Sequence, residues 1–118
     1  MAAPQLEDGP RAFLKALASE TRQRIMELFA GGVELTVGEV AERSGLGQST
    51  ASEQLSLLRR GGLLDSRRTG KLVRYRADVE GIGANLAALQ GYLVRCCPPR
   101  PVVDGADANT TAPGSCGG

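Results

Sequence analysis

The sequence contains no histidine and no tryptophan, and only two phenylalanines and two tyrosines occur among its 118 residues. Without histidine or a Cys-x-x-Cys motif, the chain lacks the usual base and the usual redox pair of a thiol enzyme, so we expect no catalytic activity. Its length suits one domain. Because large aromatic side chains are scarce, we expect the core to be completed by pairing with a second copy of the chain.

Long apolar runs are also absent from the sequence. No stretch approaches the roughly 20 apolar residues of a membrane-spanning helix, and the N-terminus MAAPQLEDGP is acidic where a signal peptide begins with basic residues. We therefore expect a cytoplasmic protein, in which thiols stay mostly reduced. The three cysteines then favour a metal-binding, catalytic or sensing role over a disulfide framework, although buried inert cysteines are also common.

The net charge of +1 conceals a basic segment. Residues 48–76 carry seven basic and two acidic side chains, whereas the stretches before and after them are acidic overall. Such a local excess suits a polyanionic partner and equally suits a solvated face, so charge alone does not choose between the two.

Apolar residues recur at helical spacing in the first half of the chain and predict helices over residues 11–17, 20–30, 37–43 and 48–60. Ser19 is the expected N-cap of the second helix, and Thr36 with Glu39 forms a Thr-x-x-Glu capping box before the third. A glycine-containing turn joins the third and fourth helices. These two helices have the pattern of a helix-turn-helix.

A basic hairpin follows this pair of helices. Residues 63–67 and 72–77 are predicted strands around a turn at 68–71, and Val73 and Tyr75 alternate with Arg74 and Arg76. A two-stranded hairpin is marginal by itself, so it must pack against the helices as the wing of a winged-helix domain does. The order of elements predicts a mainly α fold with a small β-hairpin, a winged helix-turn-helix.

The last predicted helix, over residues 78–95, carries a heptad seam. Its apolar positions are spaced three and four residues apart, at Val79, Ile82, Leu86, Leu89 and Leu93. A partner helix is the natural surface for this seam, although the same residues could pack within one subunit. Because Pro98 should end the helix at residue 95 or 96, we expect a folded domain over residues 1–97 and a flexible tail over residues 98–118.

The start of the fourth helix carries short polar side chains, which a helix in the major groove uses to reach base edges. The predicted base contacts are Gln48, Ser49, Thr50 and Ser52. The predicted phosphate contacts are basic side chains of this helix and of the hairpin: Arg59, Arg67, Arg68, Lys71, Arg74 and Arg76. The alternative is that the basic hairpin is only a solvent-exposed surface on a domain that does not bind DNA. The preceding helix-turn-helix pattern favours double-stranded DNA as the partner.

Two consecutive stretches, ALASETRQRIMELF and LTVGEVAERSGLGQSTASEQLSLLRRGGLLDSRRTGKLVRYR, resemble the ArsR/SmtB family of bacterial winged-helix repressors, most of all its arsenic(III)-responsive type. The resemblance covers Ala16 to Arg76. It implies a homodimer joined by its first and last helices, so that Phe13 and Leu17 would join the heptad seam at the interface. It also implies a repressor that binds a palindromic operator and leaves it when a metal or metalloid binds.

Both of the sensor positions that are usual in this family are empty here. Many relatives carry a cysteine pair at the first helix of the helix-turn-helix, where this chain has LTVGEV, and others bind zinc through histidines of the last helix. The remaining candidates are Cys96 and Cys97 at the end of the last helix and Cys116 in the tail. Trivalent arsenic or antimony is soft and takes three sulfur ligands, so these thiols predict a repressor that responds to As(III) or Sb(III).

Several alternatives stay open at this point. If Cys116 is not a ligand, a pair of thiols favours a monosubstituted organic arsenical over the inorganic ion. A redox-responsive thiol switch of the same fold, a sensor of a different metal and a regulator without an effector are the other functional possibilities. Cys96 and Cys97 could also be small apolar residues that cap the dimer core.

Overall fold

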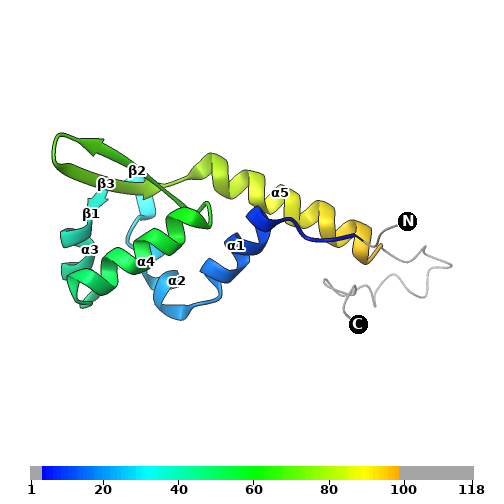
Figure 1. Cartoon of the computed structure of the whole chain (residues 1–118), viewed down its shortest axis with the longest axis horizontal. Coiled ribbons are helices and arrows are strands. Elements are labelled where there is room, and N and C mark those ends of the chain that lie inside the picture. The colour runs from blue at the N-terminus through cyan, green and yellow to red at the C-terminus, as the bar shows by residue number, and fades with distance from the viewer. Residues whose placement is uncertain (1–3, 99–118) are drawn as a thin grey trace.

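The computed structural model describes residues 4–98 and has the element order of a winged helix-turn-helix (Figure 1). Helices α1 (Asp8–Leu17) and α2 (Glu20–Glu27) are followed by a short 3-10 turn, η1 (Ala30–Gly32), and by strand β1 (Leu35–Thr36). Helices α3 (Val37–Ser44) and α4 (Gln48–Arg60) form the helix-turn-helix. Strands β2 (Leu64–Thr69) and β3 (Leu72–Ala77) form the hairpin, and α5 (Val79–Cys96) follows it. The mainly α winged fold expected from the sequence is confirmed.

Side-chain caps set the starts of two helices as predicted. The hydroxyl of Ser19 accepts a hydrogen bond of 3.3 Å from the backbone N–H of Arg22 at the start of α2. At the start of α3, Thr36 accepts from the backbone N–H of Glu39, and the Glu39 carboxylate accepts from the backbone N–H of Thr36 at 2.8 Å. This reciprocal pair satisfies two backbone donors that a helix start would otherwise leave open.

Two helix bounds differ from the sequence expectation. α1 begins at Asp8 and therefore includes Pro10, which lies in its first turn and is buried. Proline is tolerated there because the first-turn N–H groups have no partner within the helix. α2 ends at Glu27, before the predicted residue 30, and the chain passes through η1, where Gly31 has a φ of 80°. That left-handed conformation favours glycine and cannot continue an α-helix.

The wing is part of a three-stranded antiparallel sheet with the order β1-β3-β2. Arg67 of β2 lies opposite Arg74 of β3, and Leu35 of β1 lies opposite Tyr75. Strand β2 runs to Thr69, so the turn is the two-residue segment Gly70–Lys71 and is tighter than predicted. Pairing with β1 ties β3 to the start of α3, which anchors a hairpin that would be marginal alone.

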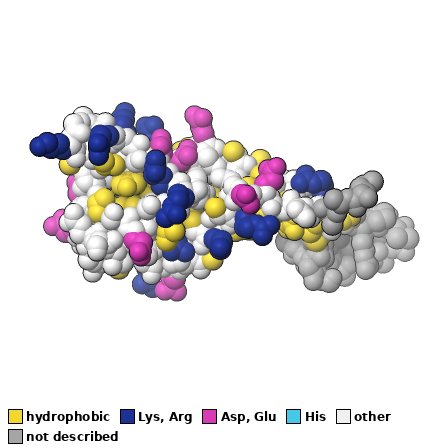
Figure 2. All heavy atoms as spheres, viewed as in Figure 1, with side chains coloured by type: hydrophobic (Ala, Val, Ile, Leu, Met, Phe, Trp, Pro, Cys, Tyr) yellow, Lys and Arg dark blue, Asp and Glu magenta, His cyan; other side chains and the backbone are white. Residues whose placement is uncertain are grey.

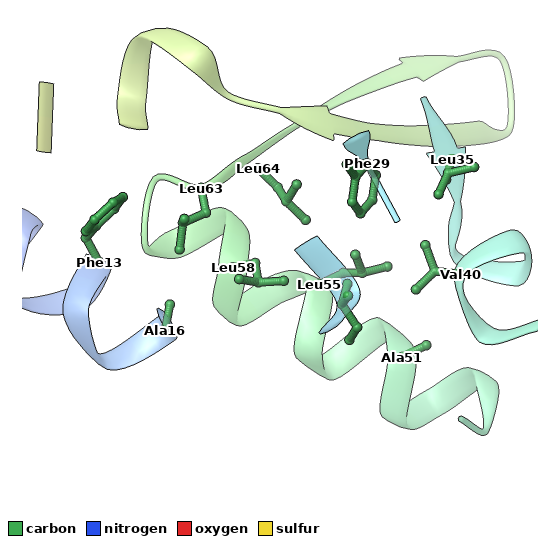
Figure 3. Packing of buried hydrophobic residues seen from close by; sticks show 11 residues of the cluster. Phe13, Ala16, Phe29, Leu35, Val40, Ala51, Leu55, Leu58, Leu63 and Leu64 are labelled. Atoms are coloured by element: carbon green, nitrogen blue, oxygen red, sulfur yellow. The ribbon is translucent and has the colours of Figure 1, made fainter. Parts of the chain in front are cut away.

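The core lies between the helix-turn-helix, α1, α2 and the sheet (Figure 3). Ala51, Leu55 and Leu58 line the inner face of α4 and have no exposed surface, as the predicted apolar face requires. The described chain buries no polar or charged side chain. The complete set of buried hydrophobic residues is Phe13, Ala16, Ile25, Phe29, Leu35, Val40, Ala51, Leu55, Leu58, Leu63 and Leu64.

Helix α5 extends away from the winged domain with α1 beside its first half (Figure 1). The turn after α4 is closely approached by α5 at Gly62 and by α1 at Gly61. A Cβ added at Gly81 would lie 2.8 Å from the carbonyl oxygen of Gly62, and one added at Gly61 would lie 2.8 Å from the Cβ of Ala16. A movement of α5 or α1 would therefore displace the turn that follows α4. Among residues 4–98, no helix combines the length and apolarity needed to span a membrane.

Candidate DNA-binding surface and thiol site

The four residues predicted to contact bases lie at the start of α4. Gln48, Ser49, Thr50 and Ser52 are all exposed. The helix begins after Gly47, which offers no side-chain cap, and its first turn contains no acidic residue. The first backbone N–H groups of α4 are therefore open to a phosphate or a base edge, and nothing in that turn repels a polyanion.

Arg22 fixes the position of α4 relative to α1, a role that the sequence alone did not show. Its Nε donates to the carbonyl oxygen of Ala16 at 2.8 Å, and its Nη2 donates to that of Lys15 at 3.2 Å. Its Nη1 donates to Oε1 of Gln54 on α4 at 2.8 Å. One guanidinium thus satisfies carbonyls at the end of α1 and holds the outward-facing helix in place.

The basic hairpin is less positive on its outer face than the sequence indicated. Arg67 donates from Nη2 to both carboxylate oxygens of Glu34, at 3.0 and 3.3 Å. Arg76 lies 3.6 Å from the carboxylate of Asp65 in the neighbouring strand. Acidic side chains accordingly lie near the junction of the hairpin and α5, while basic side chains project from the far end of the hairpin (Figure 2).

The other basic side chains that were predicted to contact phosphate differ from Arg67 and Arg76 in their pairing or their exposure. Arg59, Arg68 and Lys71 are exposed and form no ion pair with any residue between 4 and 98. Arg74 is half-buried. The tip of the wing and the C-terminal end of α4 therefore carry the cations that are available to a phosphate backbone without breaking an internal pair.

The Glu39 carboxylate, which caps the start of α3, has a lowered pKa. The hydrogen bond from the Thr36 backbone lowers the pKa of Glu39 below its ordinary value, and the nearby charges of Arg43 and Arg74 act in the same direction. The capping carboxylate is therefore ionised at neutral pH. The ionised form is the one that accepts the capping hydrogen bond from the Thr36 backbone.

The heptad seam of α5 splits into two rows. Ile82 and Leu89 pack against the core of their own subunit, as the sequence analysis had left open. Val79, Leu86 and Leu93 are 76%, 53% and 50% exposed and form an apolar row along the outside of the helix. No residue of α5 is fully buried in the single chain.

The first helix requires one correction at the expected interface. Phe13 is only 2% exposed because it packs in the core of its own subunit, so it has almost no surface left for a partner. Leu17 is partly buried against the same core. Leu14, which we had not predicted, is 45% exposed and is the large apolar residue of α1 that a second subunit could cover.

The structure brings Cys96 and Cys97 together at the end of α5, with their Sγ atoms 2.9 Å apart. Cys96 is a free, exposed thiol, whereas Cys97 is half-buried and disulfide-bonded. Cys116 lies outside the described residues. Between residues 4 and 98, no group of three or more cysteine or carboxylate side chains is arranged to hold a metal ion.

Known proteins place this architecture in a family. A helix-turn-helix domain family matches residues 17–67. The probable mercury resistance operon repressor of Streptomyces lividans is 33% identical over 100 residues, which cover 80% of this chain and 79% of that protein. The solution structure of the homodimeric winged helix-turn-helix domain Mb0332 from Mycobacterium bovis, a possible ArsR-family transcriptional regulator, has a TM-score of 0.59 and 36% identity over 71% of this chain and 77% of that one. The chain belongs to the ArsR/SmtB family.

As an ArsR/SmtB-type chain, it is a winged helix-turn-helix transcriptional regulator and carries a DNA-binding domain. A further similar crystal structure is that of a possible transcriptional regulator for arsenical resistance, with a TM-score of 0.59 and 32% identity over 70% of this chain and 84% of that one. Arg22, Gln54 and Glu34 are the site residues that sequence reasoning missed, since each acts through a partner distant in the chain.

Proposed function

We propose that this chain is a repressor that binds operator DNA as a homodimer and is released when trivalent arsenic or antimony binds its cysteine thiolates. The observation that carries the proposal is the pair of sulfur atoms 2.9 Å apart at the end of the helix with the exposed apolar row. Adjacent thiolates suit a soft, sulfur-seeking metalloid. Similarity to a probable mercury resistance repressor and to a possible regulator for arsenical resistance supports a thiol-seeking inducer.

Cys96 and Cys97 supply two of the sulfur ligands in this proposal, and Cys116 supplies the third. The tail between Cys97 and Cys116 is long enough for the ends to meet, and the entropic cost of closing such a loop grows slowly with its length. Cys97 must be reduced before it can bind, which suits the cytoplasmic setting expected from the sequence.

The homodimer in this proposal forms through the outer row of α5 together with Leu14 of α1. The known homodimer of Mb0332 supports this assembly. Because α5 and α1 both approach the Gly61–Gly62 turn closely, a ligand that shifts the end of α5 changes how α4 is held in each subunit. The two α4 helices of the dimer then no longer fit successive major grooves of the operator. The ligand-bound dimer therefore has a lower affinity for DNA than the free dimer, which is the allosteric coupling.

Arsenite titration of the reduced full-length chain with a count of thiols tests the ligand set. Loss of three thiols per chain supports the full site, and loss of two supports a pair that favours a monosubstituted organic arsenical. The Cys116→Ser variant separates these cases, since only the three-thiol site loses affinity for arsenite. No loss of thiols in the wild-type chain refutes the proposal.

A redox-responsive repressor of the same fold is the second candidate, and the two sulfur atoms 2.9 Å apart at an exposed helix end favour it. In that case oxidation of the thiols by a mild peroxide, and not arsenite, releases DNA. Reversal by a dithiol reductant completes the cycle. Reversible loss of DNA binding with peroxide, together with no response to arsenite, would select this candidate.

A further inference from the structure

The wing contains an internal ion pair between residues that are far apart in the chain. Glu34 immediately precedes β1, and Arg67 lies on β2. Because the strand order is β1-β3-β2, the Arg67 side chain must cross β3 to reach its partner. Nη2 of Arg67 donates to both carboxylate oxygens, at 3.0 and 3.3 Å, so the guanidinium already has an anionic partner within the subunit.

The two members of this pair differ in their access to water. The Arg67 side chain is 61% exposed, but that of Glu34 is only 28% exposed. Elsewhere between residues 4 and 98, no side chain donates a hydrogen bond to the Glu34 carboxylate. If Arg67 moved to a DNA phosphate, the partly exposed Glu34 carboxylate would stay behind without this partner and close to a polyanion, and the repulsion between like charges would oppose DNA binding.

We propose that Glu34 is a positioning residue that keeps Arg67 from contributing to sequence-independent DNA binding. Sequence-independent affinity arises almost wholly from phosphate contacts that release counterions. An arginine that already has an internal carboxylate partner exchanges one anion for another when it binds phosphate, so it gains little. The wing then binds DNA through the unpaired Arg68 and Lys71 at its tip, and the polar start of α4 supplies the sequence preference.

The inference rests on the DNA-binding part of the proposed function and is independent of the metalloid. Its test uses the reduced full-length chain without arsenite and a fluorescent duplex of arbitrary sequence. The Glu34→Gln variant frees Arg67 for one phosphate contact. At 0.1 M monovalent salt this should strengthen binding about 8-fold and steepen the log–log salt dependence by about 0.9.

Two further variants separate this effect from a simple change in net charge. Glu20→Gln removes a carboxylate that also pairs with an arginine, Arg24, at 2.8 Å, but it lies on α2 outside the wing. This control should change binding less than about 2-fold and leave the slope as in the wild type. When Arg67 is already replaced by glutamine, adding Glu34→Gln should change DNA affinity by no more than Glu20→Gln does.

Each outcome decides the inference. An unchanged or weaker affinity of Glu34→Gln overturns it, as does a gain that persists when Arg67 has been replaced. If the wild-type chain binds no duplex at all, both this inference and the DNA-binding part of the proposed function are wrong. If the wild type binds and only the Glu34 effect is missing, the proposed function stands without the inference.

Discussion

Replacing Leu86 by alanine should weaken the proposed dimer without unfolding the subunit. Leu86 is 53% exposed in the outer row of α5, between Val79 and Leu93. Alanine is the best helix former, so the substitution favours α5 itself. Because Leu86 is 53% exposed in the single subunit, only about half of its packing is lost there.

The size of the effect follows from the exposed fraction. Leucine to alanine removes about three methylene-sized groups, each worth about 0.8 kcal/mol when fully buried. With 53% of the side chain still exposed, about 1.3 kcal/mol is available to the interface from each subunit. A two-fold symmetric dimer contains the residue twice, which gives about 2.6 kcal/mol, or roughly a 70-fold rise in the dimer dissociation constant.

Sedimentation equilibrium of the full-length chain measures this constant directly. Leu72→Ala is the matched control, because Leu72 is a leucine of similar exposure, 45%, that lies on strand β3 of the wing. The control should leave the dissociation constant within about 2-fold of the wild-type value. The reasoning is refuted if Leu86→Ala dimerises as tightly as the wild type, or if both variants weaken the dimer equally.

Three further predictions concern stability, measured by urea unfolding. Gly61→Ala should lower the free energy of unfolding by about 1–3 kcal/mol, because its Cβ would lie 2.8 Å from the Cβ of Ala16. Gly83→Ala is the control: it lies inside α5, meets no atom within 4 Å and should not lower the free energy of unfolding. Equal losses in the two variants would contradict the close packing at Gly61. Thr36→Ala should cost about 1 kcal/mol through loss of the cap. The pKa of Glu39 is lowered in the folded chain, so its ionised carboxylate stabilises the fold fully above its ordinary pKa, and this stabilisation is lost as the pH falls through the lowered pKa. On acidification the wild type should therefore lose more free energy of unfolding than Glu39→Gln. Equal losses in the two proteins would contradict a stabilising role for the ionised Glu39.

Local sequence patterns predicted most of the fold. α4 occupies the predicted residues 48–60, and the capping box before α3 formed as its spacing required, because both depend on neighbours within one or two helical turns. Strand β1 was not predicted, since two residues cannot show a period of two. Its existence depends on pairing with β3, a contact between distant parts of the chain.

The same distinction separates the predicted and the missed features of the site. The polar start of α4 was visible because exposure follows from helical periodicity. The Glu34–Arg67 pair joins residues 33 positions apart, and the Arg22–Gln54 bond joins residues 32 apart, so no local pattern could show either. Phe13 was assigned to the interface between subunits from a resemblance, and the packing of α1 on its own subunit places it in the core.

The most direct test of the central proposal is the effect of arsenite on DNA binding. A duplex selected from a random pool by the reduced protein supplies the probe, and fluorescence anisotropy follows its release. We predict that arsenite weakens binding of the wild type by about 5- to 150-fold, the usual range of allosteric coupling, and leaves the Cys96→Ser complex intact. Wild-type binding that is insensitive to arsenite, or a Cys96→Ser complex released at the same concentration, would contradict the account.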